Sequence, residues 1–201
     1  MKARKVPGLD PHGELADNVA RIARVRLDEL CDFVPAVLDA SEVAALHDMR
    51  IAAKRLRYLL EATAETCFGD YARTAAKRAR DLQGLIGEIH DCDVAIPRVE
   101  QALEAIETAD EEELVDRAED ASDLDPRLAG ELPHADEHRG LVTLLIYLRA
   151  RRRVLYRQFL VAWREWERDG VRPRLLYALA ERPESITPRS PDDNDSGSSP
   201  A

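Results

Sequence analysis

Helical spacing of the apolar residues is the feature of this sequence that most restricts its fold. In the clearest stretch, apolar side chains follow one another three or four positions apart, which places them on one face of an α-helix. These residues are Leu46, Met49, Ala53, Leu56 and Leu60. Runs of alternating apolar and polar residues, the pattern of a β-strand, are not evident. The sequence therefore predicts an all-α fold of antiparallel helical bundles.

Capping and turn residues divide this pattern into several helices. Ser41 is a suitable N-cap, whereas Gly69 and Gly170 are typical of helix C-termini. The predicted helices run from about 13 to 35, 41 to 69, 70 to 90, 91 to 120 and 141 to 168, with a short one after 173. Prolines, glycines and acids between Ala121 and Gly140 indicate a linker, and residues 183–201 are expected to form a disordered tail.

One of these boundaries depends on a small cluster of residues. Asp91 and Asp93 are expected to cap the start of the fourth helix, and Pro97 falls near its first turn, where proline is tolerated. In that position the two carboxylates would orient neighbouring basic side chains rather than contact an anionic ligand.

Charge is unevenly distributed along the chain. The formal net charge is −10, which by itself argues against a polyanionic partner. However, residues 44–80 contain eight Lys or Arg against four acids, and residues 140–174 contain nine against three. The segment between them, residues 100–139, contains fifteen acids and three bases. Two basic blocks therefore remain within an acidic protein.

The first basic block forms a line along one helix. His47, Arg50, Lys54 and Arg57 are spaced i, i+3, i+7 and i+10, so they lie beside the apolar seam over about 15 Å. Such a line can be the solvated flank of an amphipathic helix. Acidic partners are nevertheless scarce, since Asp48 is the only acid between residues 42 and 61. An anionic ligand could therefore also bind along this line.

Two further lines repeat this arrangement. One joins Arg73, Lys77 and Arg80 and continues through Gly84 and Gly87, where glycine permits the close approach of a ligand or of another helix. The other consists of Arg149, Arg153 and Arg157, with Arg152 beside them. If the bundle turned these lines toward one groove, their guanidinium groups would form a track for a linear phosphate chain.

Two other functions compete with this interpretation. The pairs His47-Asp48 and His90-Asp91, with Asp93, could belong to a metal-dependent phosphohydrolase, although such sites need further ligands from other helices. A helical nucleic-acid-binding or scaffold protein is disfavoured, because few aromatic residues are available along the lines for base stacking. Cys31, Cys67 and Cys92 have no disulfide or zinc-ligand spacing, and we expect no metal and no cofactor.

Two motifs resemble those of the CHAD domain family, the conserved histidine α-helical domains. The stretch LHDMRIAAKRLRYLLE resembles its signature helix through His47, Arg50, Lys54, Arg55, Leu56 and Arg57. LQGLIGEIHDCDVAIPRVE resembles its second block through Gly87, His90, Asp91, Asp93 and Val94. The arginine-rich LLIYLRARRRVLYRQFLVAWR is similar to the long helix that opens the family's C-terminal half.

The resemblance implies two related helical halves around a basic groove, and here the second half is abbreviated. It covers residues 11–180, with an N-terminal bundle at 11–108, an acidic helix and linker at 109–140, and C-terminal helices at 141–180. It also implies the non-catalytic binding of inorganic polyphosphate or a similar polyanion, and it is compatible with association with polyphosphate granules. The expected binding residues are His47, Arg50, Lys54, Arg55, Arg57, Arg73, Lys77, Arg80, His90, Arg149, Arg152, Arg153 and Arg157.

Localisation follows from what the sequence lacks. No apolar run approaches the ~20 residues that cross a bilayer, and the basic N-terminus is not followed by an apolar segment. We therefore expect a cytoplasmic protein without a membrane partner.

Overall fold

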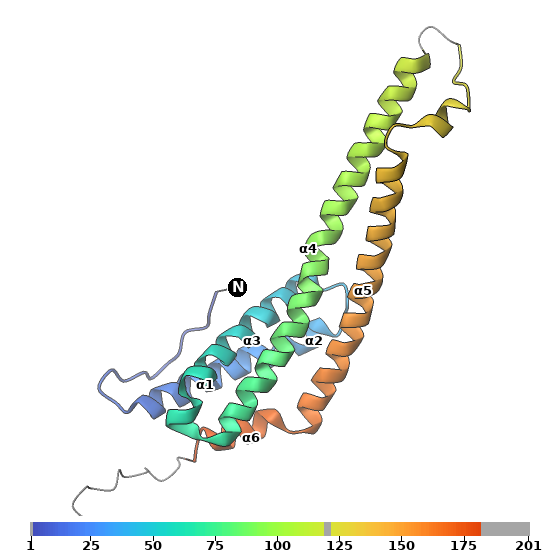
Figure 1. The fold of residues 1–201 in the computed structure, drawn as a ribbon. Coiled ribbons are helices and arrows are strands. Elements are labelled where there is room, and N and C mark those ends of the chain that lie inside the picture. Colours follow the sequence, from blue (N-terminus) through green and yellow to red (C-terminus); the bar gives the residue numbers. More distant parts are fainter. Residues whose placement is uncertain (1, 119–121, 182–201) are drawn as a thin grey trace, which may run out of the picture.

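The computed structural model describes residues 2–118 and 122–181, and these residues form an all-α fold without strands (Figure 1). The helices are α1 (Leu15–Cys31), α2 (Val34–Val37), α3 (Val43–Thr63), α4 (Asp70–Ala118), α5 (Ala135–Arg168) and α6 (Val171–Ala178). A π-helical turn (Ala64–Phe68) follows α3, and a 3-10 turn (Leu128–Glu131) precedes α5. No helix in the described ranges is long and apolar enough to span a membrane. The predicted all-α bundle is confirmed, whereas the predicted tail lies outside the described residues.

The main core lies where α1, α3, α4, α5 and α6 meet. The apolar seam predicted on α3 is buried, since Met49, Ala53, Leu56 and Leu60 are each 0% exposed. Both predicted glycine stops are also present, because Gly69 (φ 73°) and Gly170 (φ 62°) have the left-handed φ that favours glycine at helix ends. At Gly69 the chain reverses, so that α4 returns antiparallel along α3.

Helix α4 is a single helix of 49 residues, and the predicted start of a fourth helix at Asp91–Asp93 is wrong. Ile89 and Cys92 are buried, so the apolar side of α4 continues without interruption past the two aspartates. Pro97 lies inside the helix, where its missing N–H removes one backbone hydrogen bond. Continuous packing on this side outweighs both the capping tendency of aspartate and the proline.

The distal part of α4 and the first half of α5 form an antiparallel hairpin that projects from the rest of the molecule (Figure 1). We call this hairpin, residues 99–118 and 135–149, the arm. Its buried cluster contains only Val99, Leu103 and Leu145. Helix α5 begins at Ala135, six residues earlier than predicted. His134 and His138 explain the early start, because they contact Asp110 (2.7 Å) and Glu107 (3.0 Å) on α4.

Candidate functional site

Helices α3 and α4 bring two of the predicted basic lines together. Three contacts fix their alignment: His47 with His90, Arg50 with Gly87, and Arg57 with Arg80 through Glu61. All three follow one antiparallel register, so the i, i+3, i+7, i+10 spacing of α3 matches equally spaced positions on α4. We call the resulting surface the α3–α4 basic face, which comprises His47, Arg50, Lys54, Arg57, Arg73, Lys77, Arg80 and His90.

Two histidines mark one end of this face. The rings of His47 and His90 lie 4.7 Å apart, centroid to centroid, at an interplanar angle of 45°. Nδ1 of His47 is buried, and no hydrogen-bond partner for it exists within residues 2–118 and 122–181. Buried polar atoms are almost always hydrogen-bonded, so an atom of this kind requires an explanation such as a bound ligand. Each imidazole can donate a hydrogen bond to an anion, and a protonated ring adds charge.

Arg50 occupies space that a glycine leaves open. Its Nε lies 3.3 Å from the position that a Cβ would take at Gly87, and this Nε is buried without a hydrogen-bond partner among the described residues. The side chain is therefore held against the backbone of α4, and no contact within the described part of the chain engages its terminal nitrogens. A Cβ at Gly84 would meet no atom within 4 Å. The absence of a side chain at Gly87 thus lets Arg50 approach the backbone of α4, whereas Gly84 makes no comparable contact.

A single carboxylate serves two arginines near the middle of the face. Oε1 of Glu61 accepts hydrogen bonds from Nε (2.9 Å) and Nη2 (2.5 Å) of Arg80. It also lies 3.5 Å from Nε of Arg57, close enough for an ion pair but without hydrogen-bond geometry. The Arg57 guanidinium stacks over Tyr58 at 4.4 Å from the ring centroid. The face therefore keeps excess positive charge here.

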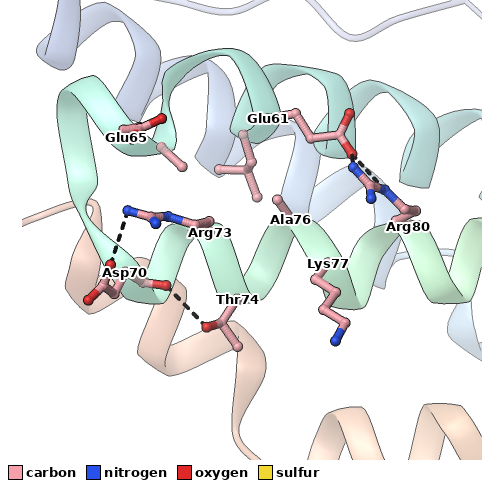
Figure 2. A pocket seen from close by; sticks show the side chains of 10 residues that line it. Glu61, Glu65, Asp70, Arg73, Thr74, Ala76, Lys77 and Arg80 are labelled. Atoms are coloured by element: carbon pink, nitrogen blue, oxygen red, sulfur yellow. Dashed lines mark hydrogen bonds and ion pairs between the residues drawn. The ribbon is translucent and has the colours of Figure 1, made fainter.

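The other end of the face borders a cavity of about 730 Å³ between α3, the π-helical turn and the start of α4 (Figure 2). Arg73, Lys77 and Arg80 line it together with Glu61 and Asp70. Arg73 pairs with Asp70 at 3.1 Å, but both side chains are largely exposed, so water screens this contact. Lys77 is exposed and points away from α3.

Two further α3 cations complete the signature helix. Lys54 is exposed, and its Nζ lies 5.6 Å from the centroid of the Tyr58 ring. Arg55 is half-buried.

The α5 arginines have a different environment. Arg152 pairs with the carboxylate of Asp93, which is 7% exposed, and donates to the Ala40 carbonyl at 2.9 Å. Arg149 pairs with Glu100 at 2.6 Å. Arg153 and Arg157 are exposed, and helical periodicity directs them away from the α4 contacts of Arg152. No contact between described residues joins these four arginines to the α3–α4 basic face.

Arg151, which the sequence analysis did not single out, lies nearer to the α3–α4 basic face. It pairs with Glu88, one turn beyond Gly84, at 2.6 Å and donates to Sγ of Cys92 at 3.5 Å. The hydrogen bond to Cys92, together with the nearby Glu88 carboxylate, raises the pKa of Arg151 above its ordinary value. Glu61 is the other important residue that sequence reasoning missed. Its i+4 spacing from Arg57 signalled one of its two ion pairs.

The two aspartates of the second motif have separate surroundings. Asp91 is exposed on α4, whereas Asp93 is held by Arg152. Since α4 is continuous here, neither caps a helix. Within the described ranges, no group of three or more His, Cys, Asp or Glu side chains is arranged to hold a metal ion. The two His-Asp pairs therefore do not assemble into such a cluster.

Comparison with known families covers the first of the two basic regions. Residues 3–100 match the family model described as CHAD domain. Over these residues the chain belongs to the CHAD domain family. Neither a curated protein nor a solved structure matches the chain. The CHAD match contains the whole α3–α4 basic face, whereas α5, which begins at Ala135, lies outside it.

Proposed function

We propose that this CHAD protein binds inorganic polyphosphate, or a similar linear polyanion, along the α3–α4 basic face and does not alter it chemically. The observation that carries the proposal is the common register of the two helices. It places His47 beside His90, Arg50 against Gly87, and Arg57 next to Arg80, so that the basic line of α4 continues the basic line of α3. CHAD membership supports the same ligand, because polyphosphate is the ligand that the family resemblance implies.

The chemistry of the face suits a chain of phosphates. From Arg73 to His90 the face is about 25 Å long, so several phosphate groups could contact it at once. Guanidinium groups bind phosphate oxygens through paired hydrogen bonds, and lysines add point charges. Glu61 and Asp70 form ion pairs with cations of the face, and Glu65 also lines the cavity at its end. A polyanion would meet a net positive surface on a protein that is acidic as a whole.

Aromatic residues favour polyphosphate over single-stranded nucleic acid. Binding of unpaired bases normally uses exposed aromatic rings as stacking platforms. Beside the α3 line Tyr58 is 50% exposed, but Arg57 and Lys54 both lie over its ring. A polymer of phosphates needs no such platform.

A competition assay tests this proposal. Long-chain polyphosphate should displace a labelled polyphosphate at much lower concentration than single-stranded DNA or orthophosphate, compared at equal phosphate. Affinity should fall steeply with salt, because binding of several phosphates releases counterions. Equal displacement by orthophosphate, or an affinity that does not respond to salt, would contradict multisite binding.

The same samples test the rival enzymatic function. Polyphosphate chain length should stay constant after incubation with the protein, with or without added divalent cations. Shortening of the polymer that disappears when His47 and His90 are both replaced by asparagine would establish hydrolysis instead.

A further inference from the structure

The arm has a smaller core than the rest of the molecule. Two helices form it, and its buried cluster consists of three residues, with Leu141 and Leu148 among the partly buried side chains around it. A helix is stabilised chiefly by burying an apolar face against other elements. One flank of the arm nevertheless carries Ile146, whose side chain is 63% exposed.

Two ion pairs identify the flank that contains Ile146. Arg149 pairs with Glu100, and His138 pairs with Glu107, across the same side of the hairpin. Helical periodicity extends this flank along each helix. On α5 it continues from Ile146 and Arg149 to Arg153 and Arg157, and on α4 it continues from Glu100 and Glu107 to Glu104 and Glu111.

Basic residues lie at one end of this flank and acidic residues at the other. Arg153 and Arg157 lie seven and eleven residues beyond Ile146, or about 10 and 16 Å toward the base of the arm. The His138–Glu107 pair lies about 12 Å from Ile146 in the opposite direction, toward the tip. By the same rise per residue, Glu104 and Glu111 lie about 8 and 18 Å from Ile146 on that side. Acids and bases are thus nearly equidistant from Ile146.

We propose that this flank binds a second copy of the chain, with the two arms antiparallel and a two-fold axis near Ile146. This arrangement places Arg153 of one copy near Glu104 of its partner, and Arg157 near Glu111, with both contacts repeated by symmetry. Ile146 then packs against its own counterpart. Parallel arms would instead bring like charges together. Glu104, Glu111, Arg153 and Arg157 have no side-chain partner within the described residues, so they are available for this contact.

A charge-exchange experiment tests the pairing. One variant carries Arg153→Glu with Arg157→Glu, and the other carries Glu104→Arg with Glu111→Arg. Sedimentation equilibrium at low ionic strength should show a dimer for the native chain and dissociation constants raised by about tenfold or more for each variant alone. Mixing the two variants should restore a 1:1 heterodimer, because the reversed bases of one variant then meet the reversed acids of the other, and the remaining native acids meet native bases. Circular dichroism checks that both variants stay helical.

Three outcomes would overturn the proposal. The native chain could remain monomeric up to submillimolar concentration, or the mixed variants could fail to associate while both remain folded. The dimer could also be weakened by Arg50→Ala with Arg57→Ala but not by the reversals at Arg153 and Arg157. In that case Glu104 and Glu111 of the arm would contact the α3–α4 basic face of the partner instead.

The apolar centre is tested separately. Ile146→Glu should convert the dimer to a monomer, since it buries two like charges at the axis. Leu15→Glu is a matched control, because Leu15 is also 63% exposed but lies at the start of α1, far from the arm (Figure 1). Equal effects of the two substitutions on dimerisation would contradict an axis at Ile146.

Discussion

The basic residues of α3 and those of α5 have nearly the same helical spacing, but their neighbours differ. The α3 line (His47, Arg50, Lys54 and Arg57) borders Gly87 and His90 and meets the basic line of α4 at Arg80. On α5, Arg149 and Arg152 each meet a carboxylate of α4. Spacing alone therefore does not separate a binding surface from a structural one. The residues that the facing helix supplies make the difference, and we expect the α3 line to contribute to binding and Arg152 to stability.

The largest effect is expected from Arg50→Ala combined with Arg57→Ala. Charge-assisted hydrogen bonds contribute about 1.5–3 kcal/mol each, so loss of both arginines should weaken polyphosphate binding by about 100-fold or more. Isothermal titration calorimetry would measure this change. Arg21→Ala with Arg24→Ala is a control that removes the same charge, because both residues are exposed on α1 and lie outside the α3–α4 basic face. Comparable losses in the two variants would mean that binding follows net charge rather than the α3–α4 basic face.

The next largest effect concerns stability. Arg152→Ala leaves the buried Asp93 carboxylate unpaired, which should lower the free energy of unfolding by about 3–5 kcal/mol. Urea denaturation followed by circular dichroism would measure it. Arg50→Ala should cost much less, because Arg50 has no carboxylate partner within the described residues. The double variant Arg152→Met with Asp93→Leu should recover much of the stability that Arg152→Ala loses, because it leaves no unpaired charge. A small loss in Arg152→Ala would show that Arg152 is not a structural residue.

A smaller effect on polyphosphate affinity is expected when Gly84 and Gly87 are replaced by alanine one at a time. Replacing glycine by alanine inside a helix adds about 1 kcal/mol of stability, so Gly84→Ala should raise the midpoint of urea denaturation, and crowding against Arg50 should offset this gain in Gly87→Ala. At Gly87 the new methyl group meets Nε of Arg50 at 3.3 Å and displaces that side chain, whereas at Gly84 it meets nothing. Polyphosphate affinity should therefore fall in Gly87→Ala only. A loss of equal size in Gly84→Ala would contradict the role assigned to Arg50 and Gly87.

The smallest effect should come from Glu61→Gln. This substitution removes the carboxylate that competes with phosphate for Arg57 and Arg80, so polyphosphate affinity should increase by up to about fivefold. Glu100→Gln removes a comparable carboxylate, the partner of Arg149 on α5, and should change affinity less. An equal increase in both variants would indicate a general effect of net charge.

Much of the fold could be predicted from local sequence patterns. The apolar spacing from Leu46 to Leu60 identified α3, and Gly69 and Gly170 identified two helix ends, because glycine alone tolerates their backbone conformation well. The boundary at Asp91 was wrong, since capping residues and Pro97 are local signals. The burial of Ile89 and Cys92 that keeps α4 continuous depends on packing against other helices.

Some features of the candidate site could likewise be predicted from local patterns, whereas others depend on packing between helices. Periodicity on one helix was sufficient to align His47 with Arg57, and the glycines on α4 indicated a close approach. The register that places Arg50 over Gly87 depends on how two helices pack, which periodicity within each helix does not specify. The partner of Arg152 is 59 residues away in sequence, and no spacing rule connects residues that far apart.

Lysine footprinting tests the central claim most directly, because the chain contains only four lysines, at positions 2, 5, 54 and 77. Lys54 and Lys77 lie on the α3–α4 basic face, whereas Lys5 is exposed near the N-terminus and serves as the internal reference. Acetylation with an amine-reactive reagent, followed by mass spectrometry, should show that long-chain polyphosphate protects Lys54 and Lys77 but not Lys5. Orthophosphate at equal phosphate should protect none of them. Protection of Lys5 to the same degree, or full reactivity of Lys54 in the saturated complex, would contradict binding along the α3–α4 basic face.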